Sequence, residues 1–211
     1  MAGRLAANQP VRIVLYGDSI SEVGRTPGYF GGASRPEMNW GKQLQALLAN
    51  EFPGRQFIVE SFGIGGQNTY EGLGRLDWLD SYQADLVLIA FGANDCGWHP
   101  IPPESTQTAM TSLVEGIQFR SGSDVVIVGA GGDNPADPLM THLAETLDAE
   151  RKAAEAAGVP FVDLRRVMLD LTDNGKRWEA YHNGIQDCHP NDRGHGIWAV
   201  TVCEAIKRSV H

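Results

Sequence analysis

The chain has few cysteines and no long hydrophobic run. Its three cysteines, Cys96, Cys188 and Cys203, are an odd and sparse set among 211 residues. No disulfide framework is indicated, and reduced thiols are the expectation. No apolar stretch is long enough to span a bilayer, and the amino end, MAGRLAANQP, lacks the apolar core of a signal peptide. These absences favour a cytoplasmic location, and secretion after removal of a signal peptide is the alternative left open.

Positive charge is also scarce. The chain has 17 Lys and Arg against 26 Asp and Glu, which gives a formal net charge of -9. A protein of this sign repels nucleic acid and anionic membrane surfaces, so neither is expected as a partner. There is no internal repeat, low-complexity segment or interdomain linker, and the hydrophobic content of 42% is that of an ordinary globular protein. We therefore expect residues 1–211 to form a single domain, and the sequence leaves its oligomeric state open.

Short apolar runs alternate along the chain with segments of helical periodicity. The predicted strands are 11–16, 56–61, 85–91, 124–129 and 159–162, and the predicted helices are 38–52, 70–82, 104–119, 139–157 and 191–208. Gly158 is predicted to end the fourth of these helices as its C-cap. Repeated strand-then-helix units imply a parallel sheet with helices on both faces. The expected architecture is an α/β protein, a three-layer α/β/α sandwich with a five-stranded parallel sheet.

Sharp Gly-rich breaks follow the first three predicted strands. They are Gly17-Asp18-Ser19, Gly63 to Asn68 and Gly92 to Asp95, and a fourth polar block, Asp187 to Asn191, lies near the carboxyl end. Because the carboxyl ends of parallel strands meet at one edge of a sheet, the side chains of the first three blocks are expected along that edge. Ser19 is well placed there for a nucleophile. The alternative is a plain turn, in which Asp18 and Ser19 only satisfy loose backbone N–H groups.

Other residues of these blocks also have a purely structural interpretation. Taken alone, Gly66 is more readily an ordinary turn glycine, and Asn94 a cap of the segment that follows it. Gly63 and Gly65 after a strand suggest a dinucleotide-binding loop, but the third glycine and the immediate helix are missing. His142 and His195 lie within predicted helices, and His182, His99 and His211 show no metal-ligand spacing with the cysteines. We therefore expect neither a metal ion nor an organic cofactor.

The four blocks, in this order, resemble those of the SGNH (GDSL-type) hydrolase family, whose name records a Ser, a Gly, an Asn and a His. Together they span nearly the whole chain. The resemblance implies the flavodoxin-like fold of that family, with Ser19 as nucleophile and His189 as the catalytic histidine. It also implies an oxyanion hole made of the backbone N–H groups of Ser19 and Gly66 and the side-chain amide of Asn94.

The chemistry of these residue types agrees with the implied roles. A serine hydroxyl is a poor nucleophile until a neighbouring imidazole takes its proton. His189 can take that proton and return it to the leaving group. The tetrahedral intermediate needs donors aimed at its oxyanion, each worth on the order of 3 kcal/mol in the barrier. A serine esterase that works through an acyl-enzyme intermediate is the leading hypothesis.

The sequence departs from the family pattern at the acidic residue. The family's acid usually stands three residues before the histidine, where this chain has Gln186. A neutral amide can orient an imidazole but cannot stabilise the imidazolium as a carboxylate does. Asp187, two residues before His189, is the favoured replacement. The alternative is a Ser–His pair whose imidazole is held by a backbone carbonyl.

The substrate is predicted from fewer features. Segment 23–36 is long for a βα connection, and loops of that size are often functional. Side chains that could stack on sugar rings, or simply pack, are Tyr29, Phe30, Trp40, Trp98, His99, Trp178 and Tyr181. No broad apolar groove for a long acyl chain is evident, so short-chain esters are favoured, acetyl esters first, on a small molecule or a carbohydrate. The alternatives are a thioesterase or lysophospholipase for longer acyl groups, and a catalytically silent carbohydrate-binding module.

Overall fold

A five-stranded sheet forms the centre of the molecule. The computed structural model describes residues 1–22, 39–97, 100–129, 134, 142–184 and 187–210. The strands are β1 Val11–Gly17, β2 Phe57–Ser61, β3 Leu86–Ala90, β4 Asp124–Gly129 and β5 Phe161–Asp163. Their order is β2-β1-β3-β4-β5, and every neighbouring pair is parallel. The predicted five-stranded parallel sheet is confirmed.

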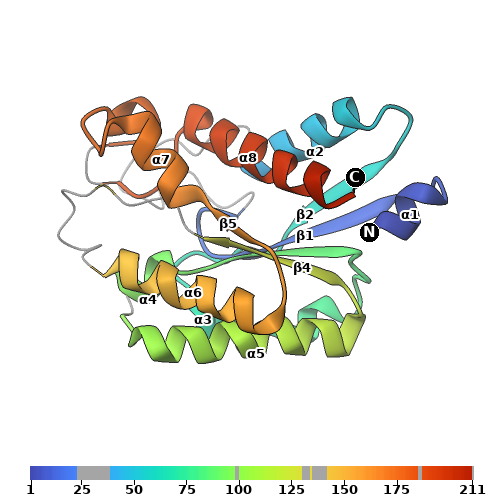
Figure 1. The fold of residues 1–211 in the computed structure, drawn as a ribbon, viewed down its shortest axis with the longest axis horizontal. Coiled ribbons are helices and arrows are strands. Elements are labelled where there is room, and N and C mark those ends of the chain that lie inside the picture. The colour runs from blue at the N-terminus through green and yellow to red at the C-terminus, as the bar shows by residue number, and fades with distance from the viewer. Residues whose placement is uncertain (23–38, 98–99, 130–133, 135–141, 185–186, 211) are drawn as a thin grey trace.

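Helices form a layer on each side of this sheet (Figure 1). On one side lie α2 (Trp40–Glu51), α7 (Leu164–Thr172) and α8 (Asp192–Val210), and on the other lie α3 (Thr69–Leu73), α4 (Ala93–Cys96), α5 (Pro103–Ser121) and α6 (Leu143–Ala157). Helix α1 (Ala2–Ala6) precedes β1, and two short 3-10 helices are η1 (Leu76–Leu79) and η3 (Trp178–Ala180). None of the helices in the described part of the chain combines the length and the apolarity needed to cross a bilayer.

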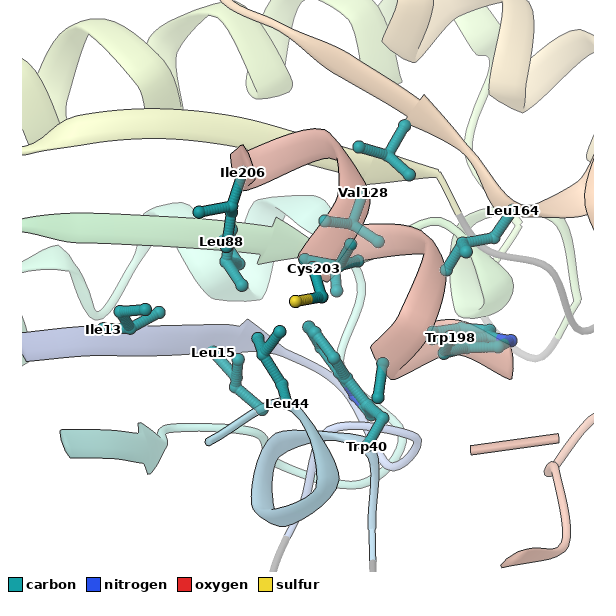
Figure 2. Close-up of a cluster of buried hydrophobic side chains, with 14 of the residues drawn as sticks. Ile13, Leu15, Trp40, Leu44, Leu88, Val128, Leu164, Trp198, Cys203 and Ile206 are labelled. Carbon is teal, nitrogen blue, oxygen red and sulfur yellow. The ribbon is translucent and has the colours of Figure 1, made fainter. Parts of the chain in front are cut away.

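The apolar run of β1 is explained by burial on both faces of the sheet. Ile13 and Leu15 belong to the hydrophobic core under α2 and α8, whereas Val14 and Tyr16 belong to the core on the α5 side. Alternate residues of a strand point to opposite faces, so a strand covered on both sides must be apolar throughout. Figure 2 shows the first core, in which the labelled side chains are Ile13, Leu15, Trp40, Leu44, Leu88, Val128, Leu164, Trp198, Cys203 and Ile206.

The continuous helix predicted over 70–82 is wrong. The segment forms α3, which ends at Leu73, and then the separate 3-10 helix η1. Gly72 and Gly74 weaken a helix here. In addition, the buried Arg75 donates to the carbonyl of Phe62 at 2.8 Å and to that of Gly17 at 3.0 Å. The break therefore lets Arg75 tie this segment to the carboxyl end of β1.

Helices α4 and α7 are not among the predicted elements. Helix α7 begins at Leu164, directly after β5, and the Asp163 carboxylate caps it by accepting the backbone N–H of Arg166 at 2.9 Å. Gly158 ends α6 with a left-handed φ of 66°, which confirms the predicted C-cap. Helix α6 begins at Leu143, and the predicted start over 139–141 lies outside the described residues.

Candidate active site

Three of the predicted blocks follow β1, β2 and β3 and meet at the edge where these parallel strands end. Ser19 lies two residues beyond β1, Gly66 lies between β2 and α3, and Asn94 lies in α4 directly after β3. The fourth block, with Asp187 and His189, reaches the same edge from the segment before α8, since the His189 ring contacts Ser19. The structure therefore brings together the residues that the sequence singled out.

Ser19, His189 and Asp187 form one continuous row of hydrogen bonds. Ser19 Oγ lies 2.9 Å from His189 Nε2, and Asp187 Oδ1 lies 2.7 Å from Nδ1 of the same ring. Asp187 Oδ1 also accepts the backbone N–H of His189 at 2.8 Å, which fixes the carboxylate beside the ring. A hydroxyl, an imidazole and a carboxylate in this order can act as a nucleophile, a general base and an orienting acid.

The charges of Asp187 and His189 stabilise each other. Burial alone lowers the pKa of His189, but the hydrogen bond to Asp187, the contact with Cys188 and the charge of Asp187 together outweigh it, so the pKa is raised above its ordinary value. Burial likewise raises the pKa of Asp187, but the hydrogen bonds from the ring and backbone N–H of His189 outweigh it and bring that pKa below its ordinary value. The carboxylate therefore stays ionised at neutral pH and is able to stabilise an imidazolium.

Neighbouring side chains hold the segment that carries the row. Trp178 Nε1 donates to the Asp187 carbonyl at 3.1 Å, and its indole stacks on the His182 ring with centroids 3.6 Å apart. The Asn183 backbone N–H donates to the His189 carbonyl at 3.1 Å. These contacts hold the backbone at Asp187 and at His189. From the sequence, Trp178 was considered for stacking on a ligand or for packing, and its hydrogen bond to the Asp187 carbonyl was missed.

Two of the three candidate oxyanion donors, Gly66 and Asn94, lie in segments that are hydrogen-bonded to each other, and the third, Ser19, follows β1. Asn94 Nδ2 donates to the carbonyl of Gln67, the residue after Gly66, at 2.9 Å, and this bond uses one of its two hydrogens. Within the described residues no acceptor is found for the backbone N–H of Ser19 or of Gly66. Gly66 has a φ of 80°, and an added Cβ would have open space around it. The left-handed backbone, rather than crowding, is what requires glycine there.

Asp95 connects these two segments. Its Oδ2 accepts the backbone N–H of Thr69 at 3.1 Å, and its Oδ1 accepts the hydroxyl of the same residue at 2.5 Å and that of Thr106 at 3.4 Å. Asp95 is fully buried, and burial raises its pKa. The sequence marked it only as part of the block after β3. Its contacts fix α4, and with it Asn94, against the start of α3.

A comparison with known protein families agrees with this geometry. The model of the GDSL-like lipase/acylhydrolase family matches residues 15–197, a range that contains every residue of the row and both candidate oxyanion segments. The chain belongs to this family. Membership confirms the predicted resemblance and places the protein in a family of hydrolases that act on ester bonds.

Solved structures and one curated sequence are similar to this GDSL-family chain. A lipase/acylhydrolase from Enterococcus faecalis superposes with a TM-score of 0.70 at 22% identity, covering 94% of this chain and 96% of that one. The acetylxylan esterase Axe2 from Geobacillus stearothermophilus gives 0.74 at 20% identity, covering 93% and 94%. An arylesterase from Vibrio mimicus is 31% identical over 125 residues, which are 58% of this chain. This match spans only 56% of the arylesterase.

Two more carboxyl groups are buried close to the row. Asp18 accepts the backbone N–H of Ile20 at 3.0 Å, and its burial raises its pKa to about 7. Glu150 of α6 is fully buried, and neither of its oxygens has a hydrogen-bond partner among the described residues. Burial raises the pKa of Glu150 well above its ordinary value. Its carboxyl lies against Gly92, where an added Cβ would collide with it, so the residue supports the start of α4.

The aromatic side chains considered for ligand stacking fall into two groups. Trp40 and Trp178 are 0% and 1% exposed, so they pack in the interior and cannot stack on a sugar ring. Tyr181 is partly buried and packs against the core under α8. Outside the described residues lie Tyr29, Phe30, Trp98, His99, segment 23–36 and Gln186. Of the two interpretations that the sequence left open for Trp40 and Trp178, stacking on a ligand and packing, the structure supports packing.

Proposed function

We propose that this GDSL-family protein is a serine esterase that hydrolyses short-chain carboxylic esters, with acetyl esters of carbohydrates as the favoured substrates. Ser19 is the nucleophile, His189 the general base and Asp187 the residue that orients and charges the imidazole. The observation that carries the proposal is the row of short contacts, 2.7 Å from Asp187 Oδ1 to Nδ1 and 2.9 Å from Nε2 to Ser19 Oγ. Such a row can move a proton away from the hydroxyl as it attacks.

Acylation begins when Ser19 Oγ attacks the ester carbonyl carbon and His189 Nε2 takes the hydroxyl proton. The Asp187 carboxylate stabilises the imidazolium that results. The carbonyl oxygen becomes an oxyanion, which accepts hydrogen bonds from the backbone N–H groups of Ser19 and Gly66 and from the Asn94 amide. Each donor lowers the barrier by on the order of 3 kcal/mol. As the intermediate collapses, Nε2 gives its proton to the departing alcohol, and the acyl group stays on Ser19.

Deacylation repeats the same steps with water as the nucleophile. His189 takes a proton from the water while its oxygen attacks the acyl carbonyl carbon, and the same donors stabilise the second oxyanion. Collapse of this intermediate breaks the bond to Ser19 Oγ, which takes the proton back from Nε2. The carboxylic acid leaves and the enzyme is restored.

Two observations support acetyl esters as the substrate class. A structural neighbour, Axe2, is named an acetylxylan esterase, which motivates the extension to this chain. The segment that carries Gly66 reads GIGGQ over 63–67, and apart from Ile64 its residues are glycines and a glutamine. Such a segment offers little apolar surface to hold a long acyl chain, whose binding depends on buried apolar area.

Hydrolysis of nitrophenyl esters of graded chain length tests the proposal. We expect the highest kcat/KM on the acetate, a decline with each longer acyl chain, and acetate release from acetylated xylo-oligosaccharides. Ser19→Ala, which removes the nucleophile and leaves the fold in place, is the matched control for background hydrolysis. A preference for long chains would favour the lysophospholipase or thioesterase alternative. No turnover of any ester by the folded protein would overturn the enzyme proposal and favour a carbohydrate-binding module.

A further inference from the structure

Cys188 stands beside the row on the side of the imidazole that faces away from Ser19. Its Sγ lies 3.7 Å from His189 Nδ1, the nitrogen that also contacts Asp187 Oδ1 at 2.7 Å. The three donor atoms lie within 4.8 Å of one another, and all three residues are partly exposed. In the part of the chain that the structure describes, no other group of three such side chains meets this spacing.

We propose that Asp187, Cys188 and His189 form an inhibitory binding site for a thiophilic divalent cation, Zn²⁺ above all. Zinc binds a thiolate at about 2.3 Å and an imidazole nitrogen or carboxylate oxygen at about 2.0–2.2 Å. In a tetrahedral site these bonds place oxygen and nitrogen about 3.3 Å apart, and sulfur and nitrogen about 3.6 Å apart. The present distances to His189 Nδ1 are 2.7 Å from Asp187 Oδ1 and 3.7 Å from Cys188 Sγ. Zinc entry therefore requires the carboxylate to move away from the ring by roughly half an ångström. The thiol is already at the required distance.

Occupation of this site removes the general base without filling the substrate site. The cation displaces the proton that Nδ1 shares with Asp187 and binds the lone pair left on Nδ1; that proton leaves to solvent and Nε2 takes one from solvent. The Cys188 thiol also releases its proton to solvent as the thiolate binds the cation. A neutral imidazole carries one N–H, so metal on Nδ1 leaves the hydrogen on Nε2. Nε2 then donates to Ser19 Oγ at the 2.9 Å contact and can no longer accept the hydroxyl proton. Inhibition therefore acts on kcat and leaves KM nearly unchanged.

The donor set also determines which cations inhibit. Sulfur and imidazole donors favour Zn²⁺ and Cd²⁺, whereas Mg²⁺ and Ca²⁺ require oxygen ligands and gain little from a thiolate. A pair of carboxylates on the surface offers only oxygen ligands and would not favour Zn²⁺ over Mg²⁺ in this way. Inhibition by Zn²⁺ with no effect of Mg²⁺ at the same concentration is thus a property of the site at Cys188.

The test compares the wild-type chain with Cys188→Ala, and uses Cys203→Ala as the matched control because that thiol is buried in the core. Each protein is freed of metal with a chelator and assayed for acetyl ester hydrolysis with increasing Zn²⁺ or Mg²⁺. Calorimetry measures Zn²⁺ binding independently. For the wild type and Cys203→Ala we expect one zinc ion per chain, at least about a tenfold loss of kcat, less than about a twofold change in KM, and recovery with EDTA.

Each variant is scored against its own metal-free activity, and Cys188→Ala is expected to need at least about tenfold more Zn²⁺ for half-inhibition and half-saturation, because one of three ligands is gone. Equal inhibition of Cys188→Ala and the wild type, an effect on KM alone, or no calorimetric binding would overturn the site. The calorimetric arm decides this question even if no ester is hydrolysed, so failure of the site and failure of the proposed esterase activity remain distinguishable.

Discussion

Two sets of carboxyl groups lie near Ser19, and the protein places them in opposite electrostatic states. Asp187 is partly exposed and paired with His189, and its pKa lies below the ordinary value. Asp18, Asp95 and Glu150 are fully buried, and burial raises the pKa of each. Nearness to the serine therefore does not decide the charge of a carboxyl group. The presence of a cationic partner decides it.

This difference separates groups that can do chemistry from groups that build the site. The row with Asp187 is open enough to exchange protons with a substrate, and its members contact each other directly. Of the buried carboxyls, Asp18 accepts the backbone N–H of Ile20 and Asp95 accepts the backbone and hydroxyl groups of Thr69, whereas Glu150 lies against Gly92 at the start of α4. We therefore expect substitutions in the row to change rate with little change in stability. Substitutions in the buried set are expected to change stability and its pH dependence.

The largest effect is expected from removing the two central members of the row. Ser19→Ala and His189→Ala should each lower kcat by on the order of 10⁶-fold, and the double variant should lose little more, because residues that act as one unit are not additive. Steady-state kinetics on one acetyl ester measures this, and thermal unfolding checks that the fold is retained. Independent, multiplying losses would contradict a shared mechanism.

The second effect concerns Asp187. Asp187→Asn should lower kcat by up to about 10⁴-fold, because the amide neither charges the imidazole nor selects its tautomer. Activity requires neutral His189, so kcat/KM rises with pH through the pKa of that ring. Asp187 raises this pKa, and its loss should move the acid limb of the pH profile to lower pH. Gln186→Ala is the control and should be mild. A loss at Asp187 below about tenfold would favour a Ser–His pair held by a backbone carbonyl.

The third effect concerns the oxyanion donors. Asn94→Ala should lower kcat by about 10²- to 10³-fold with little change in KM, because the amide acts on charge that develops only in the transition state. Kinetics on the acetyl ester measures the loss. Thr108→Ala on α5, whose hydroxyl donates to its own helix at Glu104, is a control outside the site and should leave kcat unchanged. A rise in KM alone at Asn94 would show that the residue binds substrate instead.

The smallest effect is expected in the buried set. Glu150 has a raised pKa in the folded state, so its contribution to stability is present below its unfolded pKa and is lost as pH rises towards the folded pKa. Glu150→Gln removes this titration. Denaturant unfolding at several pH values should show a smaller decline with pH for Glu150→Gln than for the wild type, with kcat nearly unchanged at neutral pH. Glu145→Gln, on the exposed face of α6, is the control. Parallel pH curves for Glu150→Gln and wild type would contradict the assignment.

Much of the fold and of the candidate site was predictable because the signals are local. An apolar run followed at once by glycines marks both a buried strand and the turn at its end, as in 11–19 and 85–95. Once the strands are parallel, the ends of β1, β2 and β3 must share an edge. The single domain and the roles assigned to Ser19, His189, Asp187, Gly66 and Asn94 stay predictions that the experiments above address.

The remainder depends on contacts that no local pattern contains. Glu150 lies in a charged, amphipathic stretch, where a glutamate ordinarily faces water. Its burial follows only from how α6 packs against Gly92. The break at Arg75 reflects two carbonyls distant in sequence. Likewise, the approach of Cys188 Sγ to Nδ1 depends on how the backbone turns between Asp187 and His189. Sequence spacing alone argued against a metal site and could not reveal this geometry.

Labelling by an organophosphate tests the central claim, that Ser19 is an activated nucleophile, most directly. In diethyl 4-nitrophenyl phosphate, Ser19 Oγ attacks phosphorus and the nitrophenolate leaves, while His189 takes the hydroxyl proton. We predict that one nitrophenolate is released per chain and that peptide mass spectrometry finds the diethylphosphoryl group on Ser19. We also predict no labelling in Ser19→Ala and a severely slowed reaction in His189→Ala. A folded wild-type protein that stays unlabelled, or that carries the group on another residue, would contradict the account.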